Sequence, residues 1–196
     1  MKSPAAIILA AGASSRMGHP KPLLPLDGET FLDRLIAAFS GICSPIIVVL
    51  GYDADRIRAG IRRAADAEFV VNPAPDRGML SSLQCGLEQL GGNVDAVLFT
   101  PADLPSIHNS TIASVAGSDA AIVVPRCGGR NGHPVRVSRV IAEELLALPA
   151  GAQARDVLHQ HRSETIFVNV DDPGILYDVD TPQDYEGLVA TSGVRT

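Results

Sequence analysis

Short apolar segments recur along the whole chain, and they constrain its fold more than any other feature. Each segment is continuously apolar instead of alternating with polar residues, which is typical of strands buried on both faces of a parallel sheet. Stretches with helical periodicity separate them, such as the apolar stripe of Phe31, Leu35 and Phe39. This alternation predicts a three-layer α/β/α sandwich with a mainly parallel central sheet. The predicted strands are AAIILA (5–10), PIIVVL (45–50), EFVV (68–71), DAVLFT (95–100), AAIVVP (120–125) and TIFVNV (165–170).

Length and charge narrow the class of protein further. A chain of 196 residues without a low-complexity linker or an internal repeat predicts one domain, 1–196. Its net charge of −6 argues against binding to nucleic acid or an anionic membrane through the overall field. The apolar stretch near the N-terminus is too short for a membrane span and lacks the features of a signal peptide, so we expect a cytoplasmic protein. Any anionic ligand must therefore be held by a local cluster of cations or by a metal ion.

The loop after the first predicted strand combines small residues, hydroxyls and cations. In an open parallel sheet, ligands bind at the carboxyl ends of the strands. In LAAGASSRMGHPK (9–21), the small residues allow backbone N–H groups to approach an anion, Arg16 offers a fork of donors, and Lys21 offers a point charge. The segment is neither a Walker loop nor a GxGxxG turn. It predicts an anion site, and the alternative is an ordinary turn with two solvated cations.

A second loop, NPAPDRGMLSSLQCGL (72–87), opens a helix at about Gly78 and places Ser81 and Ser82 in its first turn. A glycine followed by small hydroxyl residues lets a ligand lie against the helix N-terminus. The same serines are more typical of helix capping than of binding. This loop alone therefore leaves binding and capping open.

Aspartates also occur in two later loops. Asp103 comes directly after VLFT and between two prolines, where a carboxylate suits Mg²⁺, or serves as a turn or cap residue before a helix expected at 108–116. Asp178 and Asp180 face the same side of an extended segment. Thr181 is the predicted N-cap of a final helix, so its position favours Asp180 as the second metal ligand.

The segment RCGGRNGHPVRV (126–137) carries Arg126, Arg130, His133 and Arg136 among three glycines. We expect a mobile loop near the mouth of the pocket that receives an anionic second substrate. The alternative is that His133, which precedes a proline, is a plain turn residue.

These motifs, in this order, resemble the MobA-like nucleotidyltransferases, which comprise molybdenum cofactor cytidylyl- and guanylyltransferases. The resemblance implies the Rossmann-like, nucleotide-diphospho-sugar transferase type of fold. LAAGASSRMG with Lys21 resembles the family's triphosphate-binding signature, and GMLSSL (78–83) its nucleoside-contacting segment. PADLP (101–105) and DVDTPQD (178–184) resemble its metal-binding segments, and GHP (132–134) its acceptor-side loop.

The resemblance implies transfer of a nucleoside monophosphate from an NTP to the terminal phosphate of molybdopterin, with release of pyrophosphate. Asp103 and Asp180 would hold Mg²⁺, or Mn²⁺, which accepts the same ligands, while Arg16 and Lys21 would stabilise the pyrophosphate. A molybdoenzyme apoprotein or its chaperone would be a further partner. The nucleotide-binding residues implied are Leu9, Ala10, Ala11, Gly12, Ser14, Ser15, Arg16, Lys21, Gly78, Ser81 and Ser82. The acceptor-binding residues implied are Arg130, Gly132, His133 and Pro134.

Substrate choice leaves alternatives open. Ala10-Ala11-Gly12 is similar to cytidylyl members and favours CTP, with a GTP-using guanylyltransferase as the alternative. PKPLLPLDG (20–28) also resembles the methylerythritol-phosphate cytidylyltransferases, which keeps another phosphorylated acceptor, such as a sugar phosphate, open. A molybdenum cofactor carrier or chaperone without catalysis is the non-enzyme alternative. It would not need both Asp103 and Asp180.

Overall fold

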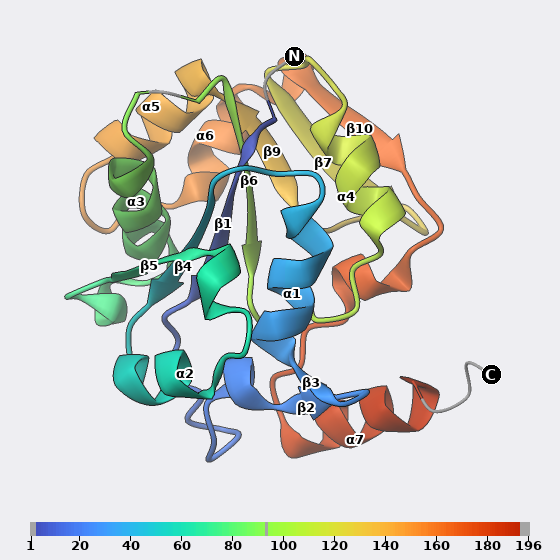
Figure 1. The fold of residues 1–196 in the computed structure, drawn as a ribbon. Coiled ribbons are helices and arrows are strands. Elements are labelled where there is room, and N and C mark those ends of the chain that lie inside the picture. Colours follow the sequence, from blue (N-terminus) through green and yellow to red (C-terminus); the bar gives the residue numbers. More distant parts are fainter. Residues whose placement is uncertain (1–2, 93, 193–196) are drawn as a thin grey trace.

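A computed structural model describes residues 3–92 and 94–192 of the chain. Its centre is an eight-stranded sheet in the order β10-β7-β9-β6-β1-β4-β5, with β8 paired to β7 (Figure 1). A separate two-stranded sheet joins β2 and β3. The strands are β1 (Ala5–Ala10), β2 (Pro25–Leu26), β3 (Glu29–Thr30), β4 (Ile46–Leu50), β5 (Glu68–Val71), β6 (Ala96–Pro101), β7 (Ile122–Cys127), β8 (Arg130–Asn131), β9 (Val135–Ser138) and β10 (Thr165–Asn169).

Helices cover both faces of this sheet, so the predicted three-layer sandwich is confirmed (Figure 1). They are α1 (Phe31–Ser40), α2 (Ala54–Gly60), α3 (Met79–Leu90), α4 (Asn109–Ala116), α5 (Arg139–Ala147), α6 (Ala154–Gln160) and α7 (Pro182–Ser192). Successive residues of β1 point to opposite faces. Ile7 belongs to the apolar cluster formed with α3, α5 and α6, and Ile8 belongs to the cluster formed with α1, α2 and α4.

All six predicted strands are present, but two of them are less buried than the sequence indicates. β1, β4 and β6 are parallel neighbours in the middle of the sheet and are buried almost throughout. β5 and β10 lie at the two edges of the sheet, where Val71 and Ile166 are half exposed. A continuous apolar run therefore predicted the strand correctly but not its burial on both faces.

Segment 126–137, expected as a mobile loop, is largely strand. β8 turns back onto β7, and β9 inserts antiparallel between β6 and β7. Val135 and Val137 of β9 are buried on the face that α5 covers. Arg136 between them is also buried, and its guanidinium donates to the carbonyl of Ala120. An arginine in the middle of so short a run obscured the strand.

A fully buried carboxylate anchors the segment that follows β10. Asp172 accepts hydrogen bonds from the His108 backbone N–H at 2.9 Å and from the Thr111 hydroxyl at 2.6 Å, both at the start of α4. It also accepts the Gly174 N–H at 3.0 Å, which fixes the turn η5 (Pro173–Leu176). The chain then crosses the carboxyl end of the sheet toward α7.

A small apolar cluster holds α7 beneath the carboxyl ends of the strands. Leu24, Leu26, Phe31, Val179 and Leu188 are buried together, so α7 packs on the β2–β3 hairpin and the start of α1. In the described ranges, no helix combines the length and apolar character needed to cross a membrane.

One ion-pair cluster on the surface predicts a pH dependence of stability. His161 Nδ1 lies 2.9 Å from Glu164 Oε1, and its Nε2 lies 2.8 Å from Glu144 Oε2 on α5. Hydrogen bonds to Glu164 and Glu144 raise the pKa of His161 above its ordinary value of 6.5. Because the pKa of His161 is higher in the folded than in the unfolded protein, its ion pairs contribute to the stability of the fold. This contribution is fully present below the unfolded pKa and is lost as pH rises through the folded pKa.

We expect His161→Asn to lower the thermal midpoint at pH 6 and to have less effect at pH 9. Melting curves of wild type and variant across this range measure the difference. His159→Asn is the matched control, since His159 is an exposed histidine of α6 without such partners among the described residues. A His161→Asn effect that stays constant with pH would contradict the assignment.

Candidate active site

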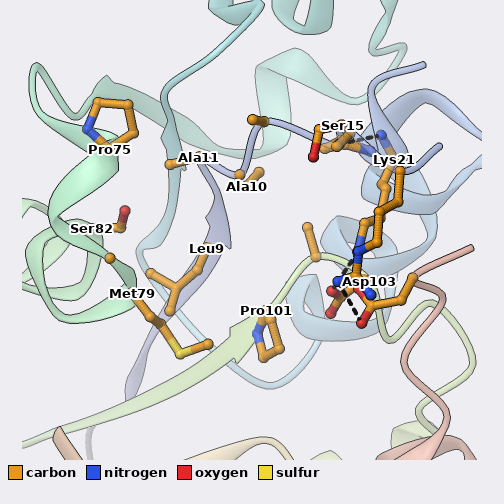
Figure 2. Close-up of a pocket in the computed structure, with 18 residues that line it drawn as sticks. Leu9, Ala10, Ala11, Ser15, Lys21, Pro75, Met79, Ser82, Pro101 and Asp103 are labelled. Atoms are coloured by element: carbon orange, nitrogen blue, oxygen red, sulfur yellow. Dashed lines mark hydrogen bonds and ion pairs between the residues drawn. The ribbon is translucent and has the colours of Figure 1, made fainter. Parts of the chain in front are cut away.

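A pocket opens at the carboxyl ends of β1 and β6, between the first loop and the start of α3 (Figure 2). Its volume is about 360 Å³, which is in the range of small-molecule sites. The predicted residues that line it are Leu9, Ala10, Ala11, Gly12, Ser14, Ser15, Arg16, Lys21, Gly78, Ser82, Asp103 and Asp180. The structure therefore brings together the first loop, the start of α3 and both predicted metal aspartates.

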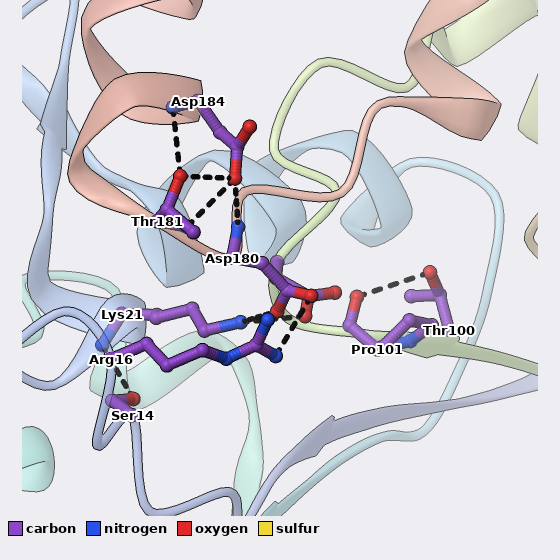
Figure 3. A network of polar contacts seen from close by, with 9 residues as sticks. Ser14, Arg16, Lys21, Thr100, Pro101, Asp180, Thr181 and Asp184 are labelled. Atoms are coloured by element: carbon purple, nitrogen blue, oxygen red, sulfur yellow. Dashed lines mark hydrogen bonds and ion pairs between the residues drawn. The ribbon is translucent and has the colours of Figure 1, made fainter.

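Cations and carboxylates meet at one end of the pocket (Figure 3). Lys21 Nζ lies 2.6 Å from Asp180 Oδ1 and 3.1 Å from Asp103 Oδ2. The Arg16 guanidinium lies 2.9 Å from Asp180 Oδ2. The backbone N–H of Lys21 donates to Ser14 Oγ at 3.0 Å, which fixes the loop that carries both cations. Lys21 thus joins two aspartates that are distant in the sequence.

The pKa values reflect this pairing. Burial lowers the pKa of Lys21, but hydrogen bonds and charge from Asp180 and Asp103 outweigh it, so the pKa is raised overall. The hydrogen bond from Lys21, followed by the influence of Arg16, lowers the pKa of Asp180. Lys21 is therefore positively charged and Asp180 negatively charged at neutral pH. Binding of an anion by the lysine and of a metal ion by the aspartate requires these charges.

The two carboxylates suit a divalent cation that is shared with a substrate. Asp103 Oδ1 is buried and has no hydrogen-bond partner among the described residues, so its lone pairs are free to ligate. The described ranges contain no group of three or more histidine, cysteine or acidic side chains placed to hold a metal. Mg²⁺ usually binds through one or two carboxylates and completes its shell with water and phosphate oxygens. The residues fit such an ion.

The scaffold fixes each aspartate through its backbone. The Val179 N–H donates to the Asp103 carbonyl at 3.0 Å, so the residue that precedes Asp180 is bonded to the Asp103 backbone. The Asp184 carboxylate accepts the N–H groups of Asp180 and Thr181 at 3.1 and 2.7 Å (Figure 3). The Asp184 N–H in turn donates to the Thr181 hydroxyl, which is the cap predicted for α7. Asp178 is exposed and does not line the pocket, whereas Asp180 does, and the role of Asp180 as a metal ligand stays a prediction.

The other end of the pocket is mainly apolar. Figure 2 shows Leu9, Pro75, Met79 and Ser82 on the side away from Lys21 and Asp103. The remaining lining residues were not among the predicted site residues, because their small or apolar side chains carry no chemical signal of their own and the resemblance did not imply them individually. They are Ala13, Pro22, Pro75, Met79, Pro101 and Ala102.

The two serines of α3 occupy different environments. Ser82 lines the pocket, whereas Ser81 is outside its lining and donates its hydroxyl to the Gly78 carbonyl at 2.8 Å. Both serines accept hydrogen bonds from Asn72, a buried residue that the sequence analysis also missed. The sequence gives no signal for Asn72, since a polar residue before a proline such as Pro73 is ordinary in a loop.

The predicted acceptor residues lie outside the lining of this pocket. Arg130 is exposed on β8, and Gly132 packs so closely on Ile175 that a side chain would overlap it. His133 Nδ1 lies 3.3 Å from the Phe99 carbonyl, and burial lowers its pKa although the charge of Asp103 partly opposes this. Pro134 is buried. Their role toward an acceptor stays a prediction.

Comparison with known proteins agrees with this geometry. The chain is 29% identical over 181 residues to the molybdenum cofactor cytidylyltransferase of Escherichia coli K12, covering 91% of this chain and 92% of that protein. It is 28% identical over 136 residues to a probable molybdenum cofactor guanylyltransferase of Bacillus cytotoxicus, covering 66% of this chain and 65% of that protein.

Solved structures are also similar to this chain over nearly its full length. Rv0371c of Mycobacterium tuberculosis H37Rv superposes with a TM-score of 0.84 at 28% identity, covering 96% of this chain and 98% of that one. A complex of the same protein with manganese superposes with a TM-score of 0.77 at 26% identity, covering 97% of this chain and all of that one. The model of the MobA-like NTP transferase domain matches residues 6–165. This chain therefore belongs to the MobA-like NTP transferase family.

Proposed function

We propose that this nucleotidyltransferase transfers CMP from CTP to the terminal phosphate of molybdopterin and releases pyrophosphate. The observation that carries the proposal is the convergence of Arg16 and Lys21 with Asp103 and Asp180 at one end of a pocket. The other end has room for a nucleoside against small and apolar residues. A nucleoside triphosphate made in the cytoplasm would be the donor, so we assign the activity to that compartment.

The proposed reaction needs alignment and charge neutralisation more than proton transfer. An acceptor phosphate oxygen forms a bond to the α-phosphorus of CTP, and the bond from that phosphorus to the bridging oxygen breaks. The electron pair leaves with pyrophosphate. Because the attacking phosphate is already an anion, no general base is required.

Arg16 and Lys21 would neutralise the charge that develops on the leaving pyrophosphate. Asp103 and Asp180 would hold a bound Mg²⁺, which supplies Lewis-acid polarisation of the phosphates. Lys21 contacts both aspartates. Its ammonium lies on a flexible stem, so it can move from the carboxylates to the phosphates when nucleotide and metal arrive together.

The choice of CTP rests on the similarity of Ala10-Ala11-Gly12 to cytidylyl members and on the Escherichia coli relative, which matches nearly end to end. The Bacillus relative, named as a probable guanylyltransferase, favours GTP as the second candidate. The same residues would serve either nucleotide at the phosphate end.

Pyrophosphate release from CTP, GTP, ATP and UTP, each with and without molybdenum-loaded molybdopterin, tests the proposal. We expect release with CTP only when the acceptor is present. Preference for GTP would keep the mechanism and overturn the choice of base. Activity on a sugar phosphate but not on molybdopterin would identify another acceptor. Nucleotide binding without release on any acceptor would favour a carrier.

We expect Asp103→Asn to reduce kcat by at least about 100-fold, because it removes a metal-binding charge while keeping the shape of the side chain. The loop carboxylate contributes little to the core, so the melting temperature should change little. Steady-state pyrophosphate release and a melting curve measure both effects. Asp178→Asn is the matched control, since Asp178 is exposed outside the pocket. Full activity in Asp103→Asn would refute the metal assignment.

Lys21→Met should lower kcat by about 100-fold, since one cation for the leaving group is lost. It should also strengthen binding of Mn²⁺ to the nucleotide-free protein, because the ammonium no longer competes for Asp103 and Asp180. Electron paramagnetic resonance of free Mn²⁺ measures this binding. Arg155→Met removes the same charge from an exposed position on α6, away from the pocket, and serves as the control. Equal Mn²⁺ affinity in wild type and Lys21→Met would show that Lys21 does not compete with the metal.

A further inference from the structure

A buried amide lies behind the nucleoside end of the pocket. Asn72 follows β5, and its side chain is almost completely buried, with 4% exposed. Its backbone N–H donates to the Leu50 carbonyl at 2.8 Å, so the residue continues the pairing of β5 with β4. Asn72 itself does not line the pocket. Any influence it has on a ligand must therefore pass through another residue.

The orientation of this amide is fixed by a group that can only donate. Asn72 Oδ1 accepts the backbone N–H of Ala74 at 2.9 Å. The Asn72 Nδ2 group therefore points the other way, where it lies 2.9 Å from Ser81 Oγ and 3.0 Å from Ser82 Oγ. An amide nitrogen carries two hydrogens, so each serine hydroxyl receives one of them.

This arrangement determines what each serine does with its own hydrogen. Ser81 donates to the Gly78 carbonyl at 2.8 Å, so its hydrogen is used within the loop. The Ser82 oxygen accepts from Asn72, and its hydroxyl donates to no group among the described residues. Ser82 is buried but lines the pocket. Its hydrogen is therefore available to a ligand in the pocket.

We propose that Asn72 is a positioning residue that makes the Ser82 hydroxyl a hydrogen-bond donor toward the nucleobase. This inference rests on the proposed function, because it takes the phosphates to lie at Lys21 and Asp103 and the nucleoside at the opposite end (Figure 2). The ligand group recognised is an acceptor on the edge of the base, either a carbonyl oxygen or a ring nitrogen. Asn72 thereby contributes to selection of the base without touching it.

Asn72→Asp reverses the polarity of this network at nearly constant shape. An ionised carboxylate only accepts, so both serines would donate to it and Ser82 would present a lone pair to the pocket. An acceptor on the base would then face another acceptor. The Ala74 N–H keeps its partner, so the backbone of the loop is retained.

Calorimetric binding of CTP and of inorganic tripolyphosphate, each with Mg²⁺, tests the proposal on wild type, Asn72→Asp, Ser82→Ala and the double variant. We expect each single variant to weaken CTP binding about tenfold and to leave tripolyphosphate binding within about twofold. The double variant should bind CTP no more weakly than Ser82→Ala alone, because Asn72 acts through Ser82. Ser81→Ala should weaken CTP binding by less than Ser82→Ala, since the Ser81 hydroxyl does not line the pocket.

Other outcomes overturn the proposal in distinguishable ways. If wild type binds CTP and Asn72→Asp binds it equally well, Asn72 does not orient Ser82, and the proposed function stands. The same conclusion follows if Asn72→Asp weakens CTP binding equally in the Ser82→Ala background. If wild type binds none of CTP, GTP, ATP and UTP, both the proposed function and this inference fail.

Discussion

The pairing of Lys21 with Asp103 and Asp180 is the interaction on which the rest of the site depends. These aspartates lie 82 and 159 residues beyond the lysine in the sequence. Two neighbouring carboxylates repel each other unless a cation lies between them. Lys21 supplies that charge, and Arg16 adds a second one at the other carboxylate oxygen of Asp180. The carboxylates of Asp103 and Asp180 can therefore lie close together, in a position suited to share a divalent ion.

The fold brings three distant segments to this point through ordinary packing. The β1 and β6 strands are parallel neighbours, so the first loop and the Asp103 loop leave the sheet side by side. Asp180 comes from the opposite end of the chain and needs its own anchors. Asp172 anchors the segment before Asp180 to the start of α4, and the backbone of buried Val179 bonds to Asp103. The Asp184 carboxylate accepts the backbone N–H of Asp180 itself. None of these three side chains lines the pocket, yet each contributes to where Asp180 lies.

The sequence predicted the elements whose signal is local. Continuous apolar runs identified the six main strands, and the carboxyl ends of those strands located the loops that line the pocket. β9 was missed because its pairing is antiparallel and its run contains a buried arginine. The separation of Ser81 from Ser82 also depends on tertiary structure, since adjacent residues of a helix point in different directions. A buried amide such as Asn72 is evident only once its partners are known.

The charged end and the nucleoside end of the pocket are thus built by different means. Ion pairs across long sequence separations make the first, whereas hydrogen bonds within residues 72–82 arrange the second. A crystal structure with CTP and Mn²⁺, with the metal located by its anomalous scattering, would examine both ends together. We expect Mn²⁺ bound directly to Asp103 and Asp180, with Lys21 moved onto a phosphate and the base beside Ser82. Manganese bound elsewhere, while Lys21 still joins the two aspartates, would contradict this expectation.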